Sequence, residues 1–169
     1  MQLKGFILTA LYTLRQAIFA GIVLLILLAF FNKFSYHPIF NAIGLSSIAS
    51  SIFIIFTAPH TLAGQNKAIV GGYVIAISLG IGFHFLLTHH FPSPSSFYYA
   101  YYPVILGGLT LTLTLLLMVT LRMPHPPAAG FALGLILDNW EFQTLLIVAC
   151  IIAALVLLKN ILDFKPLIS

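Results

Sequence analysis

The main constraint on this chain is a series of apolar runs that carry almost no charged side chains. A helix that crosses the hydrocarbon core of a bilayer needs roughly 20 consecutive apolar residues. Five runs approach this length, at about residues 16–31, 39–58, 68–87, 103–121 and 143–158. Charged residues make up only 6% of the chain, and a soluble domain would need more polar surface than that. The sequence therefore predicts a single integral membrane domain over residues 1–169, folded as an all-α, polytopic transmembrane helical bundle.

A shorter apolar run, from Ala128 to Leu137, follows directly after a base, a histidine and three prolines. Ten helical residues cover only about half of a ~30 Å hydrocarbon core. Pro126 and Pro127 suit the first turn of a helix, where an N–H group would have no helical partner. We therefore expect a half-helix as a sixth membrane segment, with free amide groups at its start. A helix start with free amides carries a partial positive charge and favours an anion.

The same stretch resembles the signature of a known family. Residues 125–128 read His-Pro-Pro-Ala, follow a base at Arg122 and precede a helix rich in small residues. This pattern resembles that of the HPP family of integral membrane proteins, whose chloroplast members have been described as nitrite transporters. A second family motif resembles residues 59–67 and the Gly-Gly-Tyr triplet at 71–73, so the HPP-like region covers about residues 39–158. The resemblance implies a membrane transporter or channel for a small inorganic anion, nitrite in particular.

Two loops of the chain share a Pro-His-x-x-Ala pattern, at residues 59–63 and 124–128. Each loop follows an apolar run, and two membrane crossings separate them, so we expect both loops on the same side. This pattern indicates either a parallel repeat with two converging helix starts or a coincidence of three identities. The candidate substrate-binding residues are His60, Gln65, Asn66, Lys67, Arg122, His125, Pro126, Pro127 and Ala128. For Lys67 and Arg122, the alternative is a position at the lipid headgroups that only sets topology.

Small residues recur at helical spacing in two of the apolar segments. We expect helix contacts at Gly72, Ala76, Gly80, Gly130 and Gly134. Serines 46, 47, 50 and 51 of the second run indicate either close helix packing or a polar path. The single cysteine, Cys150, is expected in the core as a small residue.

Two ionisable residues are candidates for proton coupling, because such groups within a membrane domain are costly and usually functional or paired. His84 lies inside the third apolar run, and Asp138 follows the half-helix. The alternatives are a hydrogen bond from His84 to a neighbouring helix and a solvated interfacial position for Asp138.

The distribution of bases predicts the topology. In the six-segment arrangement one side holds Lys4, Arg15, Lys67, Arg122, Lys159 and Lys165, and the other side holds Lys33 alone. The positive-inside rule then places both termini in the cytoplasm, in the plasma membrane, with Trp140 near the opposite interface. Residues 1–16 have the spacing of an amphipathic interfacial helix. Because the bases occur singly rather than as a stripe, we expect no nucleic acid partner.

We therefore expect an anion transporter or channel that has the lipid bilayer and a small anion as partners. A membrane assembly protein without transport is one alternative. The other is a metal-dependent enzyme that uses His60, His125 and Asp138, but the usual ligand spacings for a metal are missing from the sequence. We expect no enzymatic activity, no cofactor and no bound metal. Six short segments enclose little interior, and their small-residue faces indicate a homo-oligomer.

Overall fold

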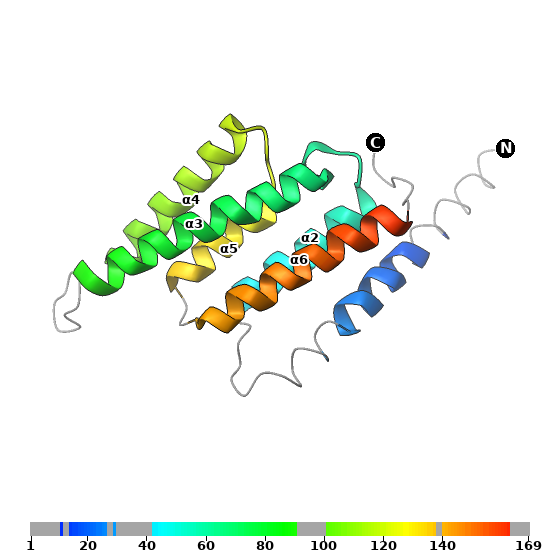
Figure 1. Ribbon diagram of the computed structural model, residues 1–169, viewed down its shortest axis with the longest axis horizontal. Coiled ribbons are helices and arrows are strands. Elements are labelled where there is room, and N and C mark those ends of the chain that lie inside the picture. Colours follow the sequence, from blue (N-terminus) through cyan, green and yellow to red (C-terminus); the bar gives the residue numbers. More distant parts are fainter. Residues whose placement is uncertain are drawn as a thin grey trace.

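The computed structural model describes residues 11, 14–26, 29, 42–90, 101–137 and 140–162, and every regular element within these ranges is a helix (Figure 1). The helices are Leu14–Ile26, α2 (Ala42–Thr57), the 3-10 turn η1 (Leu62–Gly64), α3 (Asn66–His90), α4 (Tyr102–Thr120), α5 (Pro126–Leu137) and α6 (Phe142–Leu162). The prediction of an all-α bundle is confirmed. The expected amphipathic helix over residues 1–16 falls almost wholly outside the described residues, and so does Asp138.

Three of these helices, α3, α4 and α6, are long and apolar enough to cross a membrane by length and composition. The helix at 14–26, α2 and α5 are apolar but shorter. The α5 helix has 12 residues and starts at Pro126, two positions earlier than the apolar run predicts. A helix of that length extends for about 18 Å, so it is a half-helix relative to a bilayer core.

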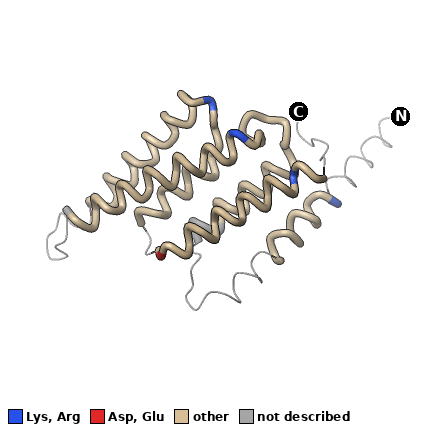
Figure 2. The backbone as a smooth tube through the Cα atoms, viewed as in Figure 1, with Lys and Arg blue, Asp and Glu red and all other residues tan. Residues whose placement is uncertain are grey.

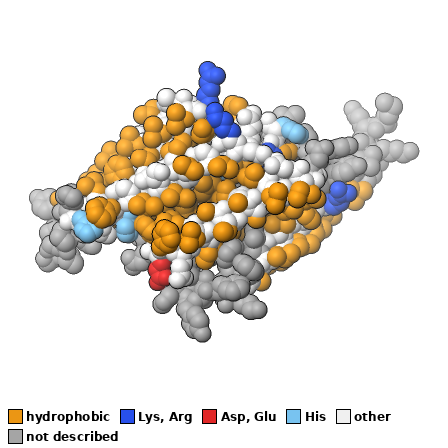
Figure 3. Space-filling view, viewed as in Figure 1, with side chains coloured by type: hydrophobic (Ala, Val, Ile, Leu, Met, Phe, Trp, Pro, Cys, Tyr) orange, Lys and Arg blue, Asp and Glu red, His pale blue; other side chains and the backbone are white. Residues whose placement is uncertain are grey.

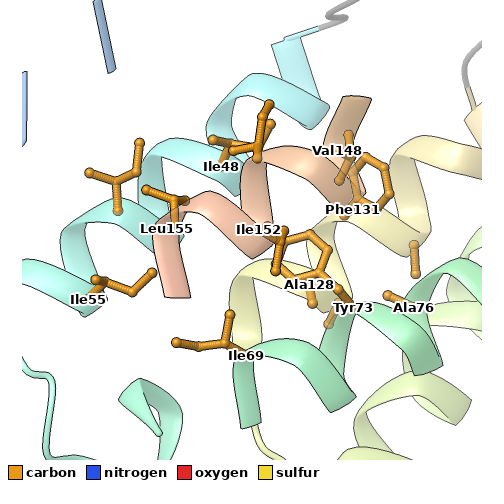
Figure 4. Packing of buried hydrophobic residues seen from close by; sticks show 14 of the residues in the cluster. Ile48, Ile55, Ile69, Tyr73, Ala76, Ala128, Phe131, Val148, Ile152 and Leu155 are labelled. Atoms are coloured by element: carbon orange, nitrogen blue, oxygen red, sulfur yellow. The ribbon is translucent and has the colours of Figure 1, made fainter. Parts of the chain in front are cut away.

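The short α5 helix occupies the centre of the bundle and packs against α2, α3 and α4. Apolar and small residues surround its axis on all sides, as expected for a helix that is buried all round. The longest helix, α3, packs against both α4 and α5, while α6 covers α2 and α3 (Figure 1). Tyr73, Ala128, Phe131 and Ile152 come together where α3, α5 and α6 meet (Figure 4).

The charged side chains separate to the two ends of the bundle. Lys67 lies in the first turn of α3, Arg122 follows α4 and Lys159 lies in the last turn of α6. Figure 2 shows the Lys and Arg residues at one end, which we call the basic end, and the acidic Glu141 at the other. The α5 helix therefore leads away from the basic end, and α6 returns to it. This arrangement agrees with six segments that alternate in direction.

Many apolar side chains are exposed on the face of the bundle seen in the space-filling view (Figure 3). Val104 and Val119 of α4 and Phe142 and Ile161 of α6 are each about two-thirds exposed. Such a surface is costly in water but suits contact with lipid chains. Cys150 lies on this exposed surface, so its expected position in the core is wrong. Its neighbours in α6 show the reason, because only the opposite stripe of the helix packs inward.

The small residues of α3 face α5 within the same chain. A Cβ atom added at Gly72 would lie 2.7 Å from the Cβ of His125, and one added at Gly80 would lie 2.8 Å from the Cβ of Leu135. Ala76, between them, is fully buried. On α5, Gly134 is buried and Gly130 lies against the Ser47 hydroxyl. These faces are used inside one chain, so they give no separate support for an oligomer.

Candidate functional site

The connection between α4 and α5 begins with a tight left-handed turn. Arg122 has a φ of 56°, a conformation that glycine adopts more easily than other residues. Its N–H donates to the Val119 carbonyl at 3.1 Å, and the Met123 N–H donates to the Met118 carbonyl at 2.7 Å. These two bonds form a Schellman motif that closes the end of α4. The chain then turns back, and three residues later His125 enters the bundle.

His125 is fully buried and forms hydrogen bonds through both ring nitrogens. Its Nδ1 lies 2.9 Å from the Ala63 carbonyl oxygen, which can only accept, so Nδ1 carries a hydrogen. Its Nε2 lies 2.9 Å from the Ser51 hydroxyl, and that hydroxyl lies 2.9 Å from the Tyr73 hydroxyl. We call Ser51, Tyr73 and His125 the His125 network. Its members come from α2, α3 and the α4–α5 connection, and all are at most 3% exposed.

Two glycines of α3 allow the connection to approach closely enough for this network. The Cβ missing from Gly72 would lie against the Cβ of His125, and the one missing from Gly71 would clash with the Met123 side chain. The ring of Tyr73, the next residue, lies with its centre 5.6 Å from that of His125 and 5.7 Å from that of Phe131. The Gly-Gly-Tyr triplet thus makes space for the imidazole and supplies a hydroxyl next to it.

A second set of polar contacts holds the η1 turn to α6. The Nζ of Lys159 donates to the Gly64 carbonyl and, at 3.0 Å, to Oδ1 of Asn66. The Asn66 amide donates in turn to Asn160 at 2.8 Å. The neighbouring carbonyls of Ala63 and Gly64 therefore accept from two different parts of the chain, an imidazole before α5 and an ammonium of α6. The η1 turn lies between these two donors.

Burial lowers the pKa of His125 because it disfavours the charged imidazolium, and the hydrogen bond to the Ala63 carbonyl opposes this effect. The neutral ring has its hydrogen on Nδ1, so Nε2 is an acceptor. The Ser51 hydroxyl then donates to Nε2, and the Tyr73 hydroxyl donates to Ser51. In this arrangement each of the two hydroxyls donates one hydrogen bond, and the Ser51 oxygen also accepts one.

The model of the HPP transmembrane region matches residues 8–162 of this chain. The chain belongs to the HPP family. The match extends well beyond residues 39–158 and includes the helix at 14–26 and the end of α6 with Lys159. Comparison with curated proteins gave no match, and neither did comparison with solved structures.

In this HPP-family bundle the start of α5 does not present free amides, so that expectation is wrong. Pro126 and Pro127 have no N–H group to offer. The next amide, that of Ala128, donates to the His125 carbonyl at 3.0 Å. Pro127 and Ala128 are also buried. The two prolines therefore remove donors from the helix start, and the polar groups that remain there belong to side chains.

The two Pro-His loops lie at the same end of the HPP bundle, but their histidines differ in environment. His60 is exposed in the turn after α2, whereas His125 is enclosed. Gln65, Lys67 and Arg122 are exposed as well. The structure therefore brings Asn66 into the contact with α6 and His125 into the core, and it leaves the other polar candidates at the surface.

Three residues of the site were not among the predicted substrate-binding residues: Ser51, Tyr73 and Lys159. Ser51 is one of the four serines for which the sequence indicates either close packing or a polar path. A signal for Ser51 was present, because Ser47 and Ser51 lie four positions apart and so share one face of an apolar helix. The proton-coupling candidate His84 lies toward the far end of α3, 11 residues or roughly 16 Å along the helix from Tyr73. Its ring packs at 5.1 Å from that of Trp140.

Proposed function

We propose that this HPP-family protein moves a small inorganic anion across a membrane and that the His125 network is a polar step on the path. Nitrite is the proposed ion because of the resemblance to the chloroplast members. The observation that carries the proposal is the network itself, an enclosed set of three hydrogen-bonded polar side chains that come from three different parts of the chain. The choice between a channel and a carrier does not affect the argument.

Enclosed polar side chains are costly, which favours a functional reason for their presence. Removing a hydroxyl or imidazole from water costs a few kcal/mol, on the order of 2–7, unless hydrogen bonds compensate for it. Ile48, Ile55 and Phe131 are buried in the same core cluster as Tyr73, so apolar side chains fill much of the surrounding core. A bundle that served only as an anchor does not require polar side chains at these positions. Polar groups at such positions in membrane proteins usually line a substrate or ion path.

The charge distribution favours an anion as the transported ion. Lys67 and Arg122 are exposed at the basic end, and Lys159 lies behind the η1 turn at the same end. The one acidic residue in the described part of the chain, Glu141, lies at the opposite end. A surface with one sign of charge concentrates ions of the other sign. We place the basic end, and with it both termini, on the cytoplasmic side by the positive-inside rule.

Because the amides at the start of α5 are not free, side chains must bind the anion. The donors available are the hydroxyls of Ser51 and Tyr73, the imidazole of His125 and the ammonium of Lys159. The η1 turn contacts His125 through the Ala63 carbonyl. Weak binding by a few such donors suits transport, since the ion must also leave.

Nitrite uptake into liposomes that contain the purified protein tests this proposal. Ser51→Ala removes the central hydroxyl of the network, and we expect uptake to fall about tenfold or more, as for a lost donor in an enclosed site. Ser78→Ala is the matched control, because the Ser78 hydroxyl also lies within hydrogen-bond distance of the carbonyl four residues earlier but is on the exposed face of α3. Folded yield, measured by size exclusion, must be equal for the two variants.

Two outcomes would contradict the proposal. One is wild-type protein that gives no more nitrite uptake than protein-free liposomes. The other is a Ser51→Ala variant that transports as fast as Ser78→Ala, because the ion would then cross without using the network.

A further inference from the structure

The His125 network has the geometry of a proton-binding site. We infer that His125 takes up the proton that accompanies the anion, and that the Ser51 hydroxyl turns between two acceptors as the proton arrives and leaves. This inference rests on the proposed function and adds the coupling ion to it. His84 and Asp138, the two candidates that the sequence offers for this role, are not needed.

Without the extra proton, every member of the network has a partner. The Nδ1–H of His125 donates to the Ala63 carbonyl, and the Ser51 hydroxyl donates to Nε2 over 2.9 Å. The Tyr73 hydroxyl donates to the Ser51 oxygen, also over 2.9 Å. The Ser47 carbonyl, 3.0 Å from the Ser51 hydroxyl, receives no hydrogen from it in this state.

With the extra proton, the same polar atoms still all form hydrogen bonds. A proton from water binds the lone pair of Nε2, and the new N–H donates to the Ser51 oxygen. The Ser51 hydroxyl hydrogen turns to the Ser47 carbonyl, which lies within hydrogen-bond distance at 3.0 Å. The Ser51 oxygen has two lone pairs and accepts from both Nε2 and Tyr73. The change needs only a rotation of one hydroxyl, so neither state leaves a polar atom unpaired.

The surroundings of His125 supply no negative charge for the imidazolium. The α2 helix contributes the hydroxyl of Ser51, α3 contributes Gly72 and the neutral Tyr73, and η1 contributes a carbonyl. From α6 comes the ammonium of Lys159 on the neighbouring carbonyl, which opposes a second positive charge.

In the described residues no carboxylate faces this site, and α4 contributes the neutral side chain of Met118 near Gly72. An anion is therefore the natural counter-charge of protonated His125. Proton and anion then favour each other's binding, and by thermodynamic linkage each raises the affinity of the other by the same factor. The pair crosses with no net charge, which avoids the cost of moving an isolated ion through an apolar bundle.

A titration followed by ¹⁵N NMR measures the proton site directly. The protein is labelled at its six histidines, placed in nanodiscs and titrated between about pH 4.5 and 8, with and without nitrite. His125→Gln assigns the signal, because glutamine keeps a donor but cannot take the proton. We expect the His125 signal to titrate within this range and its midpoint to rise with nitrite by about one pH unit, a tenfold coupling.

A second experiment measures the coupling by flux. Uptake of nitrite is followed with and without a proton gradient, and a trapped pH dye reports protons that enter with it. Protein-free vesicles are subtracted, since nitrous acid crosses bare bilayers. We expect an acidic exterior to speed wild-type uptake several-fold and to have no such effect on His125→Gln. His89→Gln, an exposed histidine at the far end of α3, is the control and should behave as the wild type.

The outcomes separate this inference from the proposed function. Nitrite uptake that depends on Ser51 but ignores the proton gradient would overturn the proton site and leave the proposed function standing. If the ¹⁵N signal of His125 remains that of a neutral imidazole at every pH of the titration, the proton site is likewise overturned and the proposed function stands. Wild-type protein without any nitrite uptake would overturn the proposed function and with it the coupling.

Discussion

A close contact between α3 and the α4–α5 connection lies at Gly72, and filling it tests the packing described above. In Gly72→Ala the new Cβ would lie 2.7 Å from the Cβ of His125, 3.5 Å from Cε of Met118 and 3.6 Å from the Cβ of Ala128. Ordinary contact begins near 3.4 Å, so α3 and the α4–α5 connection must separate by about 0.7 Å. The atom in the way is a Cβ, which cannot move without its backbone.

This separation also stretches the His125 network. Two hydrogen bonds of 2.9 Å hold the imidazole, and a 0.7 Å shift takes either of them beyond hydrogen-bond length. Forcing a methyl group into a packed core costs about 1–3 kcal/mol, and each weakened hydrogen bond adds about 1 kcal/mol. The better helix propensity of alanine returns at most about 1 kcal/mol. The net destabilisation is about 3 kcal/mol, which lowers the melting temperature by roughly 6–12 °C for a chain of this size.

Gly82→Ala is the matched control, because Gly82 lies in the same helix and has nothing within 4 Å of its added Cβ. We expect its melting temperature in detergent, followed by circular dichroism, to equal or slightly exceed that of the wild type. If Gly72→Ala and Gly82→Ala have the same melting temperature, α3 and the α4–α5 connection are not in close contact at Gly72.

Three other predictions address the site and the topology. Because burial lowers the pKa of His125, its neutral form stabilises the fold above the ordinary histidine pKa of about 6.5, and this stability should be lost as the pH falls below that value; melting curves of His125→Gln should show a weaker dependence on pH between about 7 and 5. Lys159→Met should release the η1 turn, and hydrogen exchange at the amide of Gly64 should become about tenfold faster or more than in the wild type. In a cysteine-free background, cysteines placed at Lys67 and Glu141 should react with a membrane-impermeant reagent from opposite sides, and labelling from one side would contradict the six-segment arrangement.

The helices could be predicted well because hydropathy and length decide them. The run at 103–121 became α4 at Tyr102–Thr120, and the run at 39–58 became α2 at Ala42–Thr57. The half-helix followed from its ten apolar residues and from the prolines before it. Each of these features is local, so the sequence contains all that is needed.

The site could not be predicted in the same way, because its residues are far apart in the chain. Ser51 is separated by 22 positions from Tyr73 and by 74 from His125. Their contact depends on how closely α2, α3 and α5 approach, which no local pattern gives. The two Pro-His loops share one sequence pattern but differ in burial. The pattern alone does not show that α5 is buried on all sides while the turn at His60 is exposed.

The error about free amides is of a different kind, since the sequence alone was sufficient to avoid it. A helix that starts Pro-Pro has no N–H at its first two positions, and only Ala128 remains in the first turn before the regular helical bonds begin. Counting donors would have directed attention from the backbone to the neighbouring side chains.

The left-handed backbone of Arg122 affects how any experiment on this residue is interpreted. An arginine at a φ of 56° carries a conformational penalty of about 1 kcal/mol that glycine does not have. Arg122→Gly therefore removes the charge and relaxes the turn at the same time, whereas Arg122→Gln removes the charge alone. Both variants lose the positive charge of Arg122, and Arg122→Gly should be the more stable of the two. If Arg122→Gly is more stable than Arg122→Gln but transports no better, the loss of transport in both variants results from the missing charge and not from impaired folding.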